Sequence, residues 1–170
     1  MNNVTLIGMP GSGKSTIGVI LAKALGYQFL DTDLVIQKEE KRKLSQIIAE
    51  EGPEGFKRIE NRVNASIHVT DTVIAPGGSV IYCPEAMEHL KSIGQVVYLK
   101  LSLDSLSKRL GNLKGRGVLL KEGQTLSDLY EERVPLYEKY ADITVNEYGL
   151  NVEQTIDKIL SLRNEKKCKK

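Results

Sequence analysis

A glycine-rich segment near the start of the chain limits its fold and chemistry more than any other feature. Residues 8–15 read Gly-Met-Pro-Gly-Ser-Gly-Lys-Ser, which matches the pattern G-x-x-x-x-G-K-[ST] in full. An apolar run at 4–7 precedes the segment, and a helical pattern through Ile17, Leu21 and Leu25 follows it. Glycines let backbone N–H groups converge on a phosphate, and the following helix directs its positive end at the same anion. A phosphate-binding loop lies between a strand and a helix, whereas an incidental glycine turn would not need these neighbours. The segment therefore predicts binding of a nucleoside triphosphate.

Apolar runs alternate with helical patterns along the whole chain. The runs lie at 4–7, 27–30, 72–75, 95–101 and 143–145. They are apolar throughout rather than at every second position, which is typical of parallel strands buried on both faces and predicts an α/β fold with three αβα layers. Ligands of such sheets bind at the carboxyl ends of the strands. That edge receives the glycine segment, Asp31-Thr32-Asp33 and Pro76-Gly77-Gly78-Ser79, so we expect the binding site there.

Length and composition narrow the class of protein. The chain has 170 residues and a formal net charge of +2, so we expect a single domain over 1–170 and no nucleic-acid partner. Two cysteines are too few for a disulfide framework, and no Cys/His spacing resembles a zinc site. No apolar stretch is long enough to span a membrane, and we expect no secretory signal, because the apolar run at 4–7 is short and lacks a basic flank. We expect a cytoplasmic monomer with a frayed basic tail at 163–170, of a size that fits a small-molecule or nucleotide kinase.

Three side chains beside the glycine segment have roles that follow from phosphoryl-transfer chemistry. Lys14 is expected to reach the β- and γ-phosphates, and the Ser15 hydroxyl to ligate Mg²⁺. A carboxylate next to the γ-phosphate can orient an acceptor hydroxyl and accept its proton, and Asp33 is our candidate for this role. The alternative for one of the two aspartates, Asp31 or Asp33, is that it N-caps the next helix.

Taken together, the motifs resemble those of the shikimate kinases. The resemblance rests on the glycine segment, Asp31-Thr32-Asp33, the pair Phe56 and Glu60, Gly77-Gly78, Arg116 and Arg133-Val134-Pro135-Leu136-Tyr137, in this order between residue 4 and about 145. It implies a five-stranded parallel sheet of the nucleoside-monophosphate-kinase type, with substrate-binding helices over about 34–67 and a mobile lid over about 111–123. It also implies ATP and Mg²⁺ as cofactors. The implied reaction is phosphorylation of the 3-hydroxyl of shikimate, a step toward chorismate and the aromatic amino acids.

The motifs and the resemblance together assign the site residues. The nucleotide would be bound by Gly11, Ser12, Gly13, Lys14, Ser15, Thr16, Arg109 and Arg116. The acceptor would be bound by Asp33, Lys57, Gly77, Gly78 and Arg133. By resemblance Arg109 lies against the adenine, and Asp31 lies on the Mg²⁺ side with Ser15. By resemblance, too, Arg133 binds the substrate carboxylate, because its planar guanidinium can form two parallel hydrogen bonds to it. Lys14, Asp33 and Arg116 would be catalytic, with Arg116 brought onto the transferring phosphoryl group by lid closure. For each of the three arginines, a solvated surface position is the alternative.

The chain departs from the family pattern on the acceptor side and in the lid. Lys57 stands where the family has an arginine. Its side chain keeps the positive charge but lacks the planar guanidinium that can form two hydrogen bonds to a carboxylate. Arg58 cannot simply replace it, because neighbouring helix positions lie about 100° apart. Pro53 stands where the family usually has a glutamate, and Gly117 stands where it usually has a proline. Pro76 and Ser79 flank two glycines, Gly77 and Gly78, where the family usually has three. The alternative acceptor is therefore another hydroxy acid or a sugar acid such as gluconate. A non-catalytic ATP-binding regulator is the alternative of a different class.

Overall fold

Five parallel strands form the central sheet. The computed structural model describes residues 2–110 and 121–167. The strands are β1 (Asn3–Ile7), β2 (Gln28–Asp31), β3 (Thr72–Ala75), β4 (Gly94–Lys100) and β5 (Ile143–Asn146). Their order is β2-β3-β1-β4-β5, and every pairing is parallel, so the predicted α/β fold and five-stranded sheet are confirmed. Since β1 lies between β3 and β4, the glycine segment that follows it leaves the sheet where the strand order reverses, which is where such sheets bind ligands.

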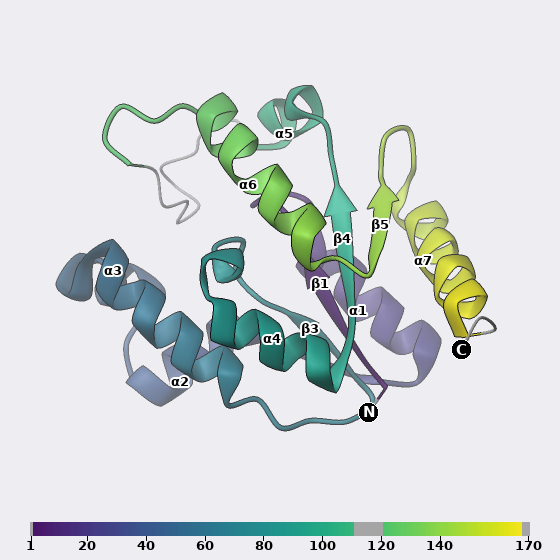
Figure 1. The fold of residues 1–170 in the computed structure, drawn as a ribbon, viewed down its shortest axis with the longest axis horizontal. Coiled ribbons are helices and arrows are strands. Elements are labelled where there is room, and N and C mark those ends of the chain that lie inside the picture. The colour runs from purple at the N-terminus through teal and green to yellow at the C-terminus, as the bar shows by residue number, and fades with distance from the viewer. Residues whose placement is uncertain (1, 111–120, 168–170) are drawn as a thin grey trace.

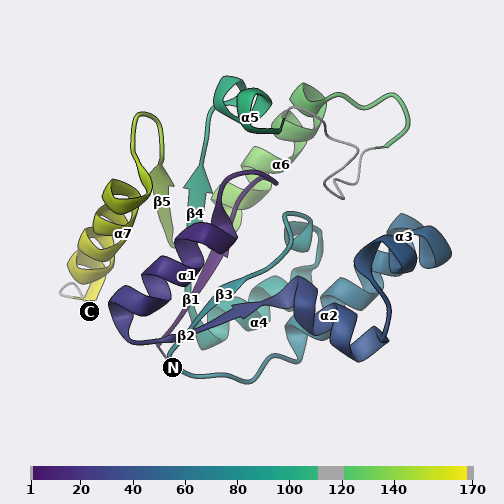
Figure 2. The ribbon, with the colours of Figure 1, turned by 180° about the vertical axis from the view of Figure 1, so that it is seen from behind.

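Helices cover both faces of this sheet (Figures 1 and 2). On one face lie α1 (Lys14–Leu25) and α7 (Val152–Lys167), and on the other α4 (Pro84–Ile93) and α6 (Leu126–Tyr140). The short α5 (Leu103–Leu110) follows β4, and a single 3-10 turn, η1 (Val80–Tyr82), precedes α4. The remaining two helices, α2 (Thr32–Glu40) and α3 (Leu44–Ala65), pack on each other, and α3 also packs on α4. The two layers of helices and the sheet between them form the predicted three-layer arrangement.

The apolar strand runs fill two separate cores, one on each face. In β4, Val96 and Tyr98 belong to the core beneath α4 and α6, whereas Val97 and Leu99 belong to the core beneath α1 and α7. Consecutive strand side chains point to opposite faces, so a strand covered on both sides needs apolar residues at every position. A third, smaller cluster joins α2 and α3. The sheet is thereby fixed from both sides, which gives its carboxyl edge a rigid base for a binding site.

The region of the expected substrate-binding helices, about 34–67, contains α2 and a kinked α3. At Gly52 the backbone leaves the helical conformation, with φ 69° and ψ 179°, and Pro53 follows directly. Glycine reaches this positive φ without the steric cost that a side chain would bring, and Pro53 lacks the N–H that a continuous helix would use. The kink separates the first turns of α3 from the part that carries Phe56 and Glu60.

The C-terminal helix is longer than the sequence indicates. We expect a helix to about Leu162 and a frayed tail from Arg163, but α7 continues to Lys167. Arg163 is buried, and its Nε donates to Oε1 of Gln95 at 3.1 Å. This contact ties the last turns of the helix to β4, which explains why a basic sequence stays helical here. In the described part of the chain, no helix is both long and apolar enough to cross a membrane.

Candidate active site

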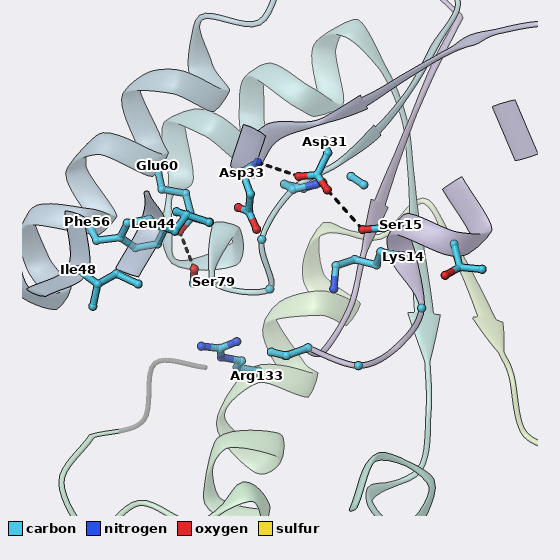
Figure 3. Close-up of a pocket in the computed structure, with 18 residues that line it drawn as sticks. Lys14, Ser15, Asp31, Asp33, Leu44, Ile48, Phe56, Glu60, Ser79 and Arg133 are labelled. Atoms are coloured by element: carbon cyan, nitrogen blue, oxygen red, sulfur yellow. Dashed lines mark hydrogen bonds between the residues drawn. The ribbon is translucent and has the colours of Figure 1, made fainter. Parts of the chain in front are cut away.

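A cavity of about 390 Å³ lies at the carboxyl ends of β1, β2 and β3 (Figure 3). Its walls come from the glycine segment, the start of α2, the helix α3, the Pro76–Ser79 turn and α6. In the close-up, Lys14, Asp33 and Arg133 reach toward the same space from three sides. The cavity is lined by Pro10, Gly11, Gly13, Lys14, Ser15, Thr16, Asp31, Asp33, Leu44, Ile48, Phe56, Glu60, Ala75, Pro76, Gly77, Gly78, Ser79 and Arg133. Most of the residues assigned from the sequence therefore converge on one place.

The glycine segment has the conformation of an anion-binding loop. Gly13 caps α1 in the left-handed region, with φ 85°, so the first N–H groups of the helix are turned toward the cavity. A side chain at Gly8 would place its Cβ 2.8 Å from the carbonyl oxygen of Leu99, so only glycine fits this turn beside β4. Ser12 is buried, and its hydroxyl has no hydrogen-bond partner in the described part of the chain. Its backbone N–H donates to the carbonyl oxygen of Met9 at 3.1 Å, which closes the turn of the loop.

Lys14 folds back over the loop that carries it. Its Nζ donates to the carbonyl oxygens of Gly8 at 2.9 Å and Met9 at 3.1 Å. Burial lowers the pKa of Lys14 to about 8, and the negative charge of Asp33 opposes that shift. A bound phosphate would favour the charged form in the same way, because an anion close to a buried ammonium compensates its lost hydration.

Ser15 and Asp31 place two oxygen atoms that could ligate a metal ion at the mouth of the loop. The Ser15 Oγ donates to Oδ2 of Asp31 at 3.5 Å, and Oδ1 of Asp31 accepts the backbone N–H of Asp33 at 3.0 Å (Figure 3). Asp31 is thus the N-cap of α2. Within 2–110 and 121–167 no cluster of three or more His, Cys, Asp or Glu side chains could hold a metal. A hydroxyl and a carboxylate completed by phosphate oxygens and water are the donor set that Mg²⁺ uses in kinases, so these residues fit Mg²⁺.

Asp33 is left free because Asp31 takes the capping role. No group in the described ranges donates a hydrogen bond to the Asp33 carboxylate. Its burial raises the pKa of Asp33 to about 6, the neighbouring charge of Asp31 adds to that increase, and Lys14 opposes it. A carboxylate with free oxygens and a pKa near the working pH is suited to accept a proton from a hydroxyl.

Glu60 is a third carboxyl group at this site, beside Asp31 and Asp33, and it is a residue to which we assigned no role from the sequence. It is fully buried on α3, and its Oε2 accepts the Ser79 hydroxyl at 2.7 Å (Figure 3). Burial raises the pKa of Glu60 to about 7, and the charge of Asp33 adds to the increase. A Cβ at Gly77 would lie 2.8 Å from Oε1 of Glu60 and 3.2 Å from Oδ1 of Asp33. The two carboxyl groups therefore close around Gly77, which explains the glycine at that position.

Burial of Glu60 predicts a measurable effect of pH on stability. Because its pKa is raised from 4.5 to about 7, the folded protein binds more protons than the unfolded chain between these values. Ionisation of Glu60 therefore destabilises the fold as pH rises through this window. Glu60→Gln retains an acceptor for Ser79 and removes the charge. We expect the variant to exceed the ligand-free wild type in unfolding free energy by about 1–3 kcal/mol at pH 8 and by little at pH 4.

Chemical denaturation at several pH values measures this difference. Glu88→Gln, on an exposed position of α4, is the matched control and should leave the pH profile unchanged. A Glu60→Gln gain that is the same at pH 4 and pH 8 would contradict the assignment of the effect to ionisation.

Arg133 is a buried cation without a carboxylate partner. Only 2% of the residue is exposed, which rules out the solvated surface position that the sequence left open. Among the described residues, no carboxylate lies within 4 Å of its guanidinium. A Cβ at Gly78 would lie 3.2 Å from its Nη1, and the Gly78 carbonyl oxygen accepts the Tyr137 hydroxyl at 2.6 Å. A buried, unpaired guanidinium at a cavity wall is arranged to receive an anionic ligand.

Lys57 lies apart from the other assigned acceptor residues. It is exposed and does not line the cavity of about 390 Å³. It lines a neighbouring cavity of about 200 Å³, which shares Phe56, Glu60, Ser79 and Arg133 with the first. Arg58 lines neither of the two, as the helix geometry predicts. Lys57 is therefore placed near Arg133 but at the outer side of the acceptor site.

The nucleotide side of the site is described in part. Arg109 is exposed on α5, and its Nη1 donates to the carbonyl oxygen of Gly11 at 3.4 Å, so it lies over the glycine segment. Arg116 and most of the expected lid lie outside the described residues. Glu147, which follows β5, has no counterpart among our predictions. It is buried, and burial raises its pKa to about 7 while the charges of Arg109 and Lys14 lower it.

Comparisons with known proteins identify the family of this chain. A family model described as shikimate kinase matches residues 10–163. The shikimate kinase of Chlorobium chlorochromatii is 36% identical, over 92% of this chain and 87% of its own length, and that of Francisella tularensis subsp. novicida is 38% identical, over 92% of each. The solved shikimate kinase of Acinetobacter baumannii, in complex with shikimate, matches with a TM-score of 0.87 and 34% identity, over 98% of this chain and 95% of that one. By sequence and by structure, over nearly all of its length, the chain belongs to the shikimate kinase family.

Proposed function

We propose that this protein transfers the γ-phosphate of ATP to the 3-hydroxyl of shikimate and releases ADP and shikimate 3-phosphate. The observation that carries the proposal is the convergence of a phosphate loop, a free carboxylate and a buried unpaired arginine on one cavity. These groups match the three features of the reaction: the phosphates of ATP, the attacking hydroxyl and the carboxylate of the acceptor.

The phosphates of ATP would be held by the backbone of the glycine segment and by Lys14. On binding, the Lys14 ammonium would exchange the carbonyl oxygens of Gly8 and Met9 for phosphate oxygens, which attract it more strongly. Ser15 and Asp31 would hold Mg²⁺, which neutralises charge on the β- and γ-phosphate oxygens when it is bound. Arg109 would lie against the nucleotide, and Arg116 would close on the transferred group.

The acceptor would lie between Asp33 and Arg133. Arg133 would bind its carboxylate, with the backbone around Gly77 and Gly78 forming the wall of the site. Asp33 would accept a hydrogen bond from the 3-hydroxyl and take its proton as the new oxygen–phosphorus bond forms and the bond to the ADP oxygen breaks. The protein thus supplies orientation and electrostatic stabilisation, which is most of what phosphoryl transfer requires.

A different hydroxy acid is the second candidate for the acceptor. The observation that favours it is the position of Lys57. This residue stands where the family pattern has an arginine, but its side chain is exposed and lies outside the larger cavity. A site with one buried cation for the acceptor carboxylate places fewer demands on the shape of the acid than a site with two.

A coupled assay of ADP release from the purified protein tests the proposal. We expect shikimate to exceed gluconate and other hydroxy acids by at least about 100-fold in kcat/KM, because Asp33 and Arg133 bind a hydroxyl and a carboxylate at a fixed separation. Removal of Mg²⁺ with a chelator should abolish turnover, and added Mg²⁺ should restore it. Faster turnover of another acid would favour the second candidate. ATP binding without ADP release for any acceptor would favour a non-catalytic regulator.

A further inference from the structure

Tyr82 lies between the acceptor site and the smaller neighbouring cavity. It is the last residue of η1, which follows the Gly77-Gly78 turn directly. The smaller cavity, of about 200 Å³, is lined by Tyr82 together with Arg133, Glu132, Gln124 and Lys121. Because Arg133 lines both cavities, the groups in the smaller cavity are in a position to determine how its guanidinium is presented to the acceptor.

The hydroxyl of Tyr82 is fixed by Glu132. It donates to Oε1 of Glu132 at 2.5 Å, and that bond contributes most to lowering the pKa of Glu132. The other oxygen of Glu132 accepts Nε2 of Gln124 at 3.1 Å and lies 3.6 Å from Nζ of Lys121. Burial and the bond to Glu132 raise the pKa of Tyr82 by more than the neighbouring Arg133 lowers it, so the hydroxyl remains protonated and able to donate. Gln124 and Lys121 therefore hold one oxygen of the Glu132 carboxylate, and the other oxygen holds the Tyr82 hydroxyl.

The ring of Tyr82 faces Arg133. The guanidinium carbon of Arg133 lies 5.4 Å from the centre of the ring, within the range of a cation–π interaction. The Nε of Arg133 is buried and has no hydrogen-bond partner in the described part of the chain. The attraction to the ring is strengthened by this burial, since little water competes for the cation. The ring orients the guanidinium without placing a negative charge on it.

Glu132 does not pair with Arg133 itself, although the two residues are neighbours in sequence. Adjacent positions on a helix point about 100° apart, and in 2–110 and 121–167 no ion pair joins these two side chains. Direct pairing would force an acceptor carboxylate to compete with Glu132 for the guanidinium. The hydrogen bond to Tyr82 holds the Glu132 carboxylate away from the Arg133 guanidinium.

We propose that Tyr82, anchored by Glu132, is a positioning residue that orients the Arg133 guanidinium for the carboxylate of the acceptor. The proposal rests on the function proposed above, and it adds a determinant of acceptor specificity outside the larger cavity, whose lining does not include Tyr82 or Glu132. Both residues act through Arg133 and are not expected to contact the transferred phosphoryl group.

The test compares shikimate with its methyl ester, which lacks the negative charge. In Tyr82→Leu, we expect KM for shikimate to rise about tenfold while kcat and KM for ATP change less than about twofold, because binding is lost without loss at the reacting groups. The preference for acid over ester in kcat/KM should fall by about the same factor, because only the acid uses the oriented guanidinium. Tyr82→Phe removes the anchoring hydroxyl, and Glu132→Gln removes the negative charge that strengthens its hydrogen bond, while both variants keep the ring. Each should therefore reduce this preference by about threefold.

Tyr27→Leu, at a half-buried tyrosine before β2 that lines neither cavity, is the matched control and should leave the preference unchanged. Equal losses for acid and ester in the Tyr82 variants would overturn the positioning role, and the Phe and Gln variants decide the question if Tyr82→Leu does not fold. If the wild type does not turn over shikimate at all, the proposed function fails and this inference fails with it. If the wild type is active, a failure belongs to Tyr82 alone.

Discussion

Asp33→Asn should lower kcat by about 100- to 10,000-fold, the range in which a positioned general base contributes to proton transfer. The asparagine side chain has nearly the same shape, but it cannot take the proton of the acceptor hydroxyl. Asp33 is free for this role because Asp31 caps α2 and no described group donates to the Asp33 carboxylate. ATP affinity should change less than about threefold, since the phosphate loop is not altered.

Steady-state rates and ATP titrations of the wild type, Asp33→Asn and Asp71→Asn measure this effect. Asp71 is an exposed residue before β3 with φ 47°, a conformation that asparagine also adopts, so its variant should behave as the wild type. Because burial raises the pKa of Asp33 to about 6, wild-type turnover should be lost as pH falls through this value and the carboxylate takes up a proton. Wild-type turnover in Asp33→Asn would refute the role given to Asp33 and would favour a non-catalytic nucleotide-binding protein.

The fold could be predicted from the sequence because its signals are local and repeated. Uniformly apolar runs indicate strands covered on both faces, and the five strands alternate with helices as such runs require. The phosphate loop is equally local, since glycines at fixed spacing determine its backbone. The predicted end of α7, near Leu162, was wrong. The contact that holds the last turns joins Arg163 and Gln95, which are far apart in the chain and give no local signal.

Which of Asp31 and Asp33 caps α2 could not be decided from the sequence, because either side chain is placed to cap the helix that follows. The extended backbone at Asp31, with φ −89° and ψ 115°, makes it the cap and turns Asp33 into the cavity. Burial of Arg133 had a signal that could have been used. Leu129 and Tyr137 lie four positions to either side of it and are buried, so all three share one face of α6. Glu147 had no comparable signal, since an acidic residue after a strand is common in exposed turns.

The choice between shikimate and another acid depends on which cation binds the acceptor carboxylate. The structure separates by burial the two cations that we assigned to the acceptor: Arg133 is 2% exposed at the wall of the larger cavity, and Lys57 is exposed outside it. A buried guanidinium can form two parallel hydrogen bonds to a carboxylate away from water, whereas an exposed ammonium is screened by solvent. Most of the affinity for the acid should therefore come from Arg133.

Arg133→Met should accordingly lower kcat/KM for shikimate by about 100-fold or more, mainly through KM, because it removes a bidentate charged pair. Lys57→Met should lower it less than about fivefold, since exposed charges are worth little. The two variants remove one positive charge each and leave a side chain of similar length, so each is the control for the other. Arg133→Met should also fold as stably as the ligand-free wild type, because an apolar side chain replaces a buried charge that has no carboxylate partner.

Initial rates over a range of shikimate concentrations, with thermal unfolding of each variant, measure both effects. Comparable losses in the two variants would mean that Lys57 moves into the acceptor site when shikimate binds, and that the family arginine has been replaced without loss of function. A large loss in Arg133→Met with no loss in Lys57→Met would mean that a single buried cation carries the recognition of the acid. In that case Lys57→Arg should not improve kcat/KM, because the side chain at this position starts outside the cavity and the fork of an arginine would have no carboxylate to bind.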